Sequence, residues 1–375
     1  MGELAVYVHT PFCPSKCPYC DFNSYARPEE EHETFTRACE LEIRRSEMRG
    51  ARVGTVFFGG GTPTFLSVER LERLFSALTS TFDITTEAEI TAEANPGTVD
   101  AERFTALRAM GFNRISIGAQ SFHDHELRTL GRVHSSSEIS RAVCAARRAG
   151  FGNLSLDLMY ALPGQTLGRW IESVKAALAF EPEHLSLYCL TIEPGTRFAA
   201  LDRHGLLDLP DEDVQIAMQE EAERLCAAAG LRRYEISNYA KPGRECEHNL
   251  SYWRNEPYAG FGPGAVSYLD GERRKNLRSP ARYAAAVLQA RDHVEEREKV
   301  GEDLWLAETL MVGLRVIEGV PFERLESRVP DSRARLASAL NDLKEKGWVE
   351  VDECSVRLTR EGLKFHDSVT MRLLP

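Results

Sequence analysis

Three cysteines near the start of the chain, Cys13, Cys17 and Cys20, are spaced as C-x3-C-x2-C and follow directly on an apolar run at residues 4–8. Three is an odd number for disulfides, and clustered thiols in a long intracellular-type chain indicate metal binding or catalysis. A ferredoxin-type cluster takes four cysteines, so three thiolates leave one iron open to a small chelating molecule. The spacing therefore predicts a metal centre with an open position. A Cys3His zinc site completed by His9 is the alternative.

A glycine-rich turn is the second motif. Gly59, Gly60 and Gly61 follow an expected strand at residues 55–58 and precede Thr62. Glycines let a ligand approach the backbone, and such a turn can present N–H groups to a carboxylate or phosphate. The common nucleotide motifs do not fit, because no G-x-x-x-x-G-K-[ST] is present and Thr64 stands where G-x-G-x-x-G needs its last glycine.

The elements that must position these motifs alternate between short apolar runs and longer amphipathic ones. Such βα units predict an α/β fold with a parallel sheet, and six of them favour an incomplete (β/α)6 TIM-like barrel over a doubly wound open sheet. The expected strands are 5–8, 55–58, 89–93, 114–117, 154–158 and 184–190, and the expected helices are 29–48, 68–80, 101–110, 137–149 and 167–179.

Polar residues stand at the ends of these strands. Glu93 closes the third strand, Gln120 follows the fourth and Asp157 lies within the fifth. Parallel α/β folds gather their sites at the carboxyl ends of the strands. We therefore expect these three side chains to lie together, although each by itself is as consistent with a buried, satisfied polar group.

The regular alternation of predicted strands and helices ends at about residue 194. A helix is expected at 212–229, a strand at 231–236, and then an irregular loop to about 269. From 302 the pattern predicts three helices and a hairpin at 348–351 and 356–358, a winged-helix-like arrangement. We divide the chain into a barrel core (1–195), a barrel extension (196–300) and a smaller C-terminal helical, winged-helix-like domain (301–375).

The amino-acid composition limits the classes of function that the protein can have. The 375 residues carry 46 Lys and Arg against 57 Asp and Glu, a net charge of -11, which opposes an electrostatic footprint for nucleic acid. No apolar run approaches the roughly 18 residues of a spanning helix, and no leader peptide is evident. The sequence predicts a cytoplasmic protein without a transmembrane segment and without a nucleic-acid partner.

Together the motifs resemble the radical S-adenosylmethionine superfamily, in which C-x3-C-x2-C holds a [4Fe-4S] cluster and a glycine-rich turn meets the methionine moiety. The sequence is similar to the branch of oxygen-independent coproporphyrinogen oxidases and their haem-chaperone relatives, on residues 60–63, 93–96, 118–122, 130–132 and 157–160. The resemblance implies cluster ligation by the three cysteines and a site for S-adenosylmethionine formed by Tyr7, Tyr19, Gly60, Gly61, Thr62, Glu93, Gln120, Arg132, Asp157 and, more weakly, Thr191.

Two departures from the oxidase favour the haem-chaperone branch. Phe22 stands where the oxidase has a fourth cysteine, and only six residues precede Tyr7, where the oxidase has a longer leading segment. The pattern H-N-x-x-Y-W, linked to haem in that branch, is present as His248, Asn249, Tyr252 and Trp253. His248 is expected to ligate haem iron, while flanking aromatics suit a porphyrin.

The resemblance thus predicts a radical SAM-type haem chaperone that binds a [4Fe-4S] cluster, S-adenosylmethionine and haem. It would pass haem to haem proteins such as respiratory enzymes at the membrane, and an electron donor would serve the cluster. A homodimer, enzymatic use of the cluster and attachment of haem through Cys246 are left open. The first alternative is an oxidase that decarboxylates coproporphyrinogen III, although Phe22 argues against that activity. A radical enzyme on an unrelated substrate, with a purely structural histidine loop, is the second.

Overall fold

The computed structural model describes residues 3–373, and its larger sheet has the strand order β12-β11-β10-β9-β1-β2-β3-β4-β5-β6-β8-β7. The central strands from β1 to β6 are parallel and follow one another in sequence order. A doubly wound sheet reverses its order at a switch point, so this progression confirms the barrel-like alternative. These strands are β1 (Leu4–Thr10), β2 (Arg52–Gly60), β3 (Asp83–Ala94), β4 (Arg114–Gln120), β5 (Leu154–Tyr160) and β6 (His184–Cys189).

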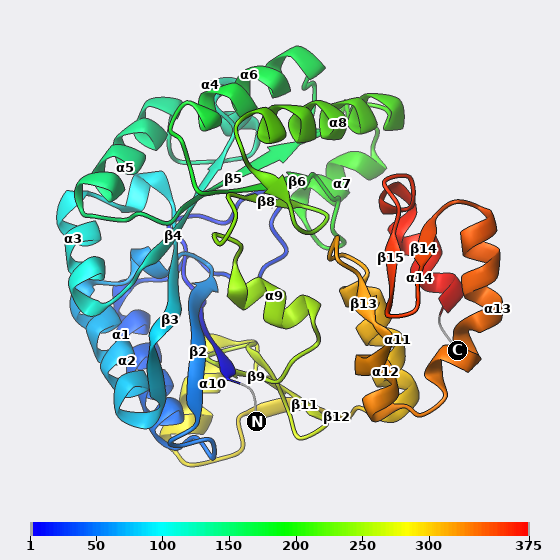
Figure 1. The fold of residues 1–375 in the computed structure, drawn as a ribbon. Helices are drawn as coiled ribbons and strands as arrows, with labels where there is room; N and C mark the ends of the chain where they lie inside the picture. The colour runs from blue at the N-terminus through cyan, green and yellow to red at the C-terminus, as the bar shows by residue number, and fades with distance from the viewer. Residues whose placement is uncertain (1–2, 374–375) are drawn as a thin grey trace.

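Helices cover the outside of these strands (Figure 1). The Ser67 hydroxyl accepts from the backbone N–H of Arg70 at the start of α2, a capping box begins α5, and Gly111 in the left-handed region (φ 113°) ends α3. The helices of the βα units are α1 (Glu29–Arg44), α2 (Val68–Thr81), α3 (Ala101–Met110), α5 (Ser136–Arg148) and α6 (Leu167–Leu178); α4 (Asp124–Thr129) is a short addition before α5.

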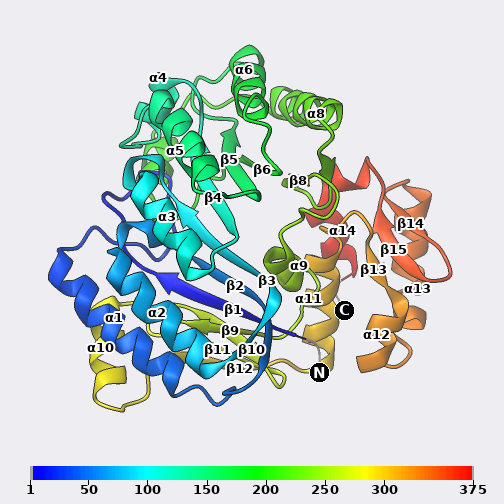
Figure 2. The same ribbon diagram turned by 60° about the vertical axis from the view of Figure 1, so that its left-hand side comes forward.

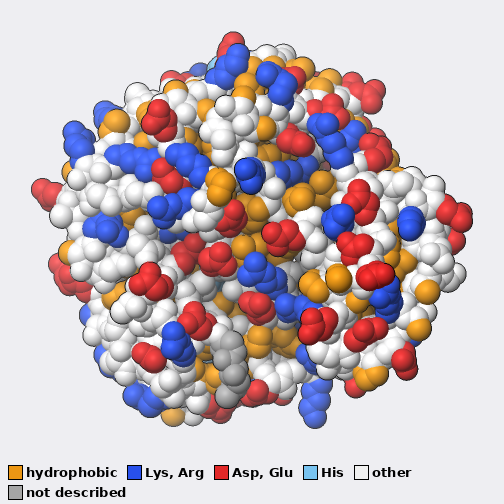
Figure 3. All heavy atoms as spheres, viewed as in Figure 1, with side chains coloured by type: hydrophobic (Ala, Val, Ile, Leu, Met, Phe, Trp, Pro, Cys, Tyr) orange, Lys and Arg blue, Asp and Glu red, His pale blue; other side chains and the backbone are white. Residues whose placement is uncertain are grey.

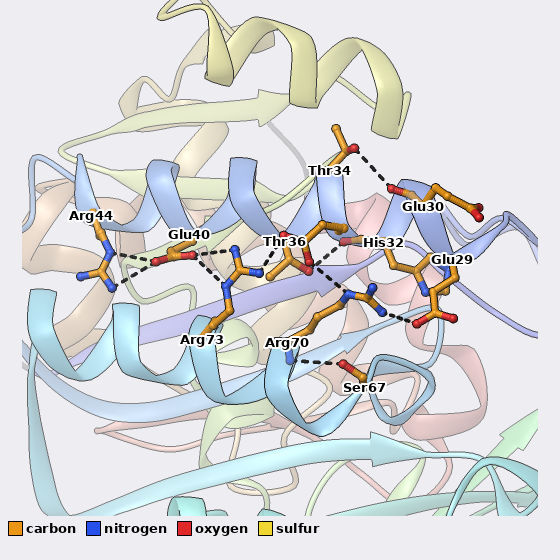
Figure 4. A network of polar contacts seen from close by, with 11 residues as sticks. Glu29, Glu30, His32, Thr34, Thr36, Glu40, Arg44, Ser67, Arg70 and Arg73 are labelled. Carbon is orange, nitrogen blue, oxygen red and sulfur yellow. Dashed lines mark hydrogen bonds and ion pairs between the residues drawn. The ribbon is translucent and has the colours of Figure 1, made fainter.

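Ion pairs join α1 to α2 on the outer surface (Figure 4). Arg70 reaches Glu29 at 2.9 Å, and Arg73 lies 2.8 Å from Glu33 and 3.1 Å from Glu40. Beneath them the apolar faces of both helices pack on the sheet in the main core. Because these charges are partly exposed, the buried apolar contact contributes most of the stability of this layer.

Additional strands extend both edges of the parallel sheet. β9 (Tyr258–Phe261) is parallel to β1 and is followed by the antiparallel β10 (Val266–Leu269), β11 (Glu272–Asn276) and β12 (Val294–Lys299). At the other edge β8 (Asn238–Ala240) and β7 (Arg232–Arg233) are antiparallel. The sheet thus has two distinct edges, β12 and β7, and the barrel is incomplete, as predicted.

The expected irregular loop up to residue 269 is wrong in part. It contains β8, β9, β10 and the seven-residue helix α9 (Glu247–Trp253), and the strand expected at 231–236 is reduced to β7. Elements this short carry too little periodicity to be read from sequence. Around them lie α7 (Arg197–Arg203), α8 (Glu212–Ala228) and α10 (Pro280–Leu288).

A buried carboxylate ties the extension to the barrel. Glu42 of α1 accepts hydrogen bonds from the backbone N–H of Gly262 (2.8 Å), Asn276 Nδ2 (2.7 Å), His293 Nε2 (3.0 Å) and the hydroxyl of Tyr283. Its hydrogen bond raises the pKa of His293. The carboxylate is satisfied on all sides, which is what makes its burial tolerable.

The C-terminal residues form a separate lobe beside α9 (Figures 1 and 2). Helices α11 (Glu302–Gly313), α12 (Phe322–Arg328) and α13 (Ser332–Glu345) precede the pair β14 (Val349–Val351) and β15 (Ser355–Leu358), with β13 (Val320–Pro321) alongside and α14 (His366–Leu373) at the end. Their apolar side chains form a second core. This is the predicted helical, winged-helix-like arrangement.

The surface carries mixed charge. Figure 3 shows acidic and basic side chains interspersed on the face seen in Figure 1. The basic run at 273–275 lies in β11, where Arg273, Arg274 and Lys275 each pair with a glutamate. None of the helices within residues 3–373 has the length and apolar character needed to cross a membrane.

Candidate cofactor site and the buried histidine motif

A cavity of about 330 Å³ lies at the carboxyl ends of the parallel strands. It brings together most of the predicted site residues from six different strand-to-helix connections. Tyr7 lines two adjoining cavities instead of this one. The predicted residues that line the main cavity are Cys13, Cys17, Cys20, Tyr19, Gly60, Gly61, Thr62, Glu93, Gln120, Arg132, Asp157 and Thr191.

The three cysteines lie in a loop that closes on itself after β1. Cys13 N–H donates to the Tyr25 carbonyl (3.0 Å), and Cys20 N–H donates to the Cys17 carbonyl (3.2 Å). Thr62 Oγ1 is 3.5 Å from Cys13 Sγ, and Arg132 Nη1 donates to Cys17 Sγ at 3.8 Å. Burial raises the pKa of the Cys13 and Cys20 thiols. Thiolates here therefore need a bound cation, and the polar contacts to sulfur fit an iron–sulfur cluster.

His9 does not complete a zinc site. Its Nδ1 is 3.0 Å from the Tyr7 hydroxyl, and its Nε2 is 2.9 Å from the Asn23 carbonyl oxygen. Burial lowers its pKa to about 4. Among residues 3–373, no group of three or more His, Cys, Asp or Glu side chains converges on a single-ion position. The geometry therefore does not support the Cys3His alternative.

The backbone N–H groups of the glycine turn donate hydrogen bonds to acceptors within the protein. Gly61 N–H donates to the Thr10 carbonyl (2.7 Å), Thr62 N–H donates to the Phe12 carbonyl (2.8 Å), and Gly60 N–H donates to Glu93 Oε2 (3.2 Å). These three N–H groups are thus engaged within the protein, and that of Gly60 binds a carboxylate of the chain itself. Gly61 is required because a Cβ there would lie 2.6 Å from the Phe12 carbonyl oxygen.

Two carboxyl groups, of Glu93 and Asp157, line the same cavity at the strand ends. Burial, together with the nearby Asp157, raises the pKa of Glu93 to about 8, so it is mostly protonated at neutral pH. Burial also raises the pKa of Asp157, against the hydrogen bond donated by Ser116 Oγ at 2.9 Å. A ligand that brings an amine or hydroxyl groups into the cavity would match both residues.

Arg132 and Gln120 complete the cavity wall. Arg132 Nη2 donates to the Gly118 carbonyl oxygen (3.0 Å) and to Asn95 Oδ1, which orients the amide of Asn95 toward Thr62 Oγ1 at 2.6 Å. Gln120, the last residue of β4, has a left-handed backbone (φ 65°), a strained conformation of the kind that functional sites retain. The cavity thus offers thiols, carboxyls, a guanidinium and an amide within one volume suited to a cofactor.

The H-N-x-x-Y-W residues lie on α9, inside the ring of strands in Figure 1. His248 is only 1% exposed, and its ring stacks on Phe57 with centroids 5.1 Å apart. Nδ1 is 2.9 Å from Thr55 Oγ1, and Nε2 is 3.0 Å from the Tyr252 hydroxyl. Burial, with Arg114 nearby, lowers the pKa of His248 to about 3. In this conformation both ring nitrogens are engaged, so the ring does not fit direct iron ligation.

Glu89 of β3 fixes the start of α9. Its carboxylate accepts from the backbone N–H groups of Glu247 (3.3 Å) and His248 (3.2 Å), and Arg114 lies 3.8 Å from it. A negative charge at the first turn is favourable for a helix. Cys246 is buried and its Sγ lies 3.5 Å from Glu89 Oε1, so this thiol does not offer an attachment point for haem.

The other motif residues have different surroundings. The Trp253 ring has Arg315 of the C-terminal lobe above it, 4.5 Å from the ring centroid. Asn249 lines a small inner cavity of about 160 Å³, and Tyr252 lines both this cavity and a lateral one. The motif therefore joins the barrel interior to the C-terminal lobe.

The sequence analysis did not predict several residues of the site. Thr55, Glu89 and Arg114 contact α9, and Asn95 and Ser116 orient cofactor-site groups. All but Asn95 are polar residues within apolar strands. In a barrel, alternate strand residues point inward, so the spacing of Glu89 to Glu93 and of Arg114 to Ser116 is a signal that could have found them.

Comparison with known proteins agrees with this geometry. The sequence profile of the Radical SAM superfamily matches residues 7–177, and that of the HemN C-terminal domain matches residues 304–365. The fold and the cysteine cavity thus define a radical SAM barrel protein. Proteins called "Heme chaperone HemW" are similar over nearly the whole chain: 37% identical in Bacillus subtilis (96% of each chain) and 39% identical in Escherichia coli (86% of this chain, 85% of the relative). The chain belongs to this HemW family.

One solved structure supports the same fold. Coproporphyrinogen III oxidase (HemN) from Escherichia coli, described as a radical SAM enzyme, superposes with a TM-score of 0.86 at 25% identity, over 99% of this chain and 90% of that one. The predicted incomplete barrel with a C-terminal helical domain is therefore confirmed.

Proposed function

We propose that this protein is a radical SAM-type haem chaperone, which binds a [4Fe-4S] cluster, S-adenosylmethionine and haem and passes haem to haem proteins such as respiratory enzymes. The observation that carries the proposal is the joint placement of the two motifs. The Tyr7 ring stacks on His248 with centroids 6.3 Å apart, and Tyr7 also lies beside Glu93, which lines the cysteine cavity. The cysteine cavity and α9 thus share one barrel interior, which supports the proposal.

Cys13, Cys17 and Cys20 would hold the cluster, and the open iron together with Glu93, Arg132 and Asp157 would hold S-adenosylmethionine. The cluster would supply one-electron chemistry when bound. The protein's own contribution is orientation and the exclusion of water, since these side chains are largely covered. Haem and haem-accepting proteins are the proposed partners, with an electron donor for the cluster; the proposed location is the cytoplasm.

Haem titration tests the proposal. Anaerobically reconstituted protein is titrated with ferric haem, with and without the cluster, and the Soret band is followed. We expect saturable binding, and transfer of the bound haem to a haem-free acceptor protein. His248→Ala should weaken binding, while His204→Ala, in an exposed position just after α7, should not. Failure of the reconstituted protein to shift the Soret band would refute the proposal.

The second candidate is oxidative decarboxylation of coproporphyrinogen III, favoured by the close superposition on HemN. Phe22 opposes it, because the sequence resemblance places a cysteine there in the oxidase. Anaerobic turnover with formation of vinyl groups would establish the oxidase activity. We expect none, even with a cluster that cleaves S-adenosylmethionine.

A further inference from the structure

Two of the three cysteine sulfurs lie within reach of side-chain donors from other strand ends. Thr62 Oγ1, just after β2, is 3.5 Å from Cys13 Sγ, and Arg132 Nη1 donates to Cys17 Sγ at 3.8 Å. Thr62 is joined to Arg132 through the side chain of Asn95, which follows β3. Arg132, Asn95, Thr62 and Cys13, from four separate connections, thus form one continuous polar chain.

The direction of each hydrogen bond in this chain follows from the donors available. A guanidinium has donors only, so the Asn95 atom that faces Arg132 is the carbonyl oxygen Oδ1. The amide nitrogen Nδ2 then faces Thr62 and donates to its Oγ1 at 2.6 Å. Because that oxygen accepts, its own O–H is free to donate, and Cys13 Sγ lies within reach. A thiolate sulfur can only accept, so each group from Arg132 to Cys13 donates to the next.

We propose that Thr62 and Asn95 tune the reduction potential of the bound cluster. Thr62 donates to the sulfur of Cys13, and Asn95 is a positioning residue that turns the Thr62 hydroxyl toward that sulfur. The inference rests on the cluster binding of the proposed function. It adds to that function two residues that are not cluster ligands and that act on the cluster through one of its ligands.

The surrounding backbone fixes the chain before any cluster is present. Thr62 is 1% exposed, and its backbone N–H donates to the Phe12 carbonyl oxygen at 2.8 Å. Arg132 Nη2 also donates to the Gly118 carbonyl oxygen at 3.0 Å, which holds the guanidinium in place. The Asn95 amide is therefore held at both ends. Donors that are oriented in advance need no rearrangement when charge develops on their acceptor.

The expected effect is on the one-electron reduction of the cluster. The electron comes from an external reductant such as dithionite, and no proton moves along the chain. Reduction adds negative charge, so hydrogen bonds to the cysteine sulfurs stabilise the reduced form more than the oxidised form. Loss of the Thr62 donor should lower the equilibrium constant for reduction about tenfold, which for a one-electron couple is a shift of about 59 mV to lower potential.

The test is a redox titration followed by electron paramagnetic resonance. It uses the full-length, anaerobically reconstituted protein without S-adenosylmethionine or haem. Thr62→Val, which keeps the shape and removes the hydroxyl, should show the tenfold effect, while Thr62→Ser, which keeps an O–H, should stay close to the wild-type potential. Thr64→Val is the matched control, because Thr64 is buried in the same turn and its Oγ1 lies 3.1 Å from Thr98 Oγ1. Its potential should equal that of the wild type.

Asn95→Ala tests the positioning role. The Thr62 hydroxyl is kept but is free to turn away, so the potential should fall by a smaller amount than in Thr62→Val. Added to Thr62→Val, Asn95→Ala should cause no further fall, because no hydroxyl is left to position.

The outcomes separate this inference from the proposed function. An unchanged potential in Thr62→Val with normal iron content, or equal effects of Asn95→Ala in both backgrounds, would overturn the inference alone. If Thr62→Val takes up no cluster, Asn95→Ala decides by itself, and an unchanged potential there would overturn the inference. A wild-type protein that takes up no cluster would overturn both this inference and the proposed function.

Discussion

Replacing Glu93 with glutamine should stabilise the cofactor-free protein at alkaline pH. Glu93 is half-buried at the end of β3, and its pKa is raised from an ordinary 4.5 to about 8 by burial and by Asp157. A carboxyl whose pKa is raised in the folded state stabilises that state when protonated. That contribution is complete below pH 4.5 and is lost as the pH rises to about 8.

The size of the effect follows from the shift. With 1.36 kcal/mol for each pKa unit, the folded state loses about 2 kcal/mol of stability by pH 6, relative to acid pH, and about 5 kcal/mol once the pH is above 8. Glutamine keeps the shape and does not ionise. The stability difference between Glu93→Gln and wild type should therefore grow in favour of the variant by about 2–3 kcal/mol from pH 6 to pH 9.

Urea unfolding of the reduced, cluster-free protein measures this difference at pH 6, 7.5 and 9. Each pH compares the two proteins in the same buffer, so the titration of groups that do not interact with Glu93 cancels. Glu102→Gln, an exposed glutamate in the first turn of α3, is the control and should show no such trend. A difference between Glu93→Gln and wild type that stays constant across this range would refute the reasoning, because it would mean that Glu93 is ionised throughout.

Three further predictions concern other parts of the molecule. Cys20→Ala should lose cluster absorption and iron content after reconstitution, while the far-ultraviolet circular dichroism is retained, because Cys20 lies in a loop. Glu42→Ala should lower the free energy of unfolding by about 3–5 kcal/mol, measured by urea titration, because it leaves buried partners in the extension unpaired. Glu89→Gln should destabilise α9 by about 1–3 kcal/mol, seen as faster amide hydrogen exchange within Glu247–Trp253 than in α8.

Each of these three has an outcome that contradicts it. Normal iron content in Cys20→Ala would remove that residue from the ligand set. A Glu42→Ala protein as stable as wild type would show that the extension is held by its strand pairing alone. Unchanged exchange in α9 of the Glu89 variant would mean that packing against β2 and α11, and not the charge at its start, holds the helix.

The sequence by itself predicted the features that depend on local spacing. The alternation of apolar runs predicts the parallel strands, and their carboxyl ends meet at one edge of the sheet, which is why Glu93, Gln120 and Asp157 were expected together and do line one cavity. The three cysteines were found in the same way, since ligands within eight residues of one another need no distant partner to be recognised.

Only the tertiary structure decided the role of the histidine motif. His248 was expected in an irregular loop as a ligand of haem iron, yet its ring is held by Thr55, 193 residues away, and its backbone by Glu89, 159 residues away. No local pattern encodes which strand a seven-residue helix will pack against. The burial of that helix in the barrel engages both ring nitrogens of His248, with Thr55 and Tyr252, and this follows from packing between distant parts of the chain.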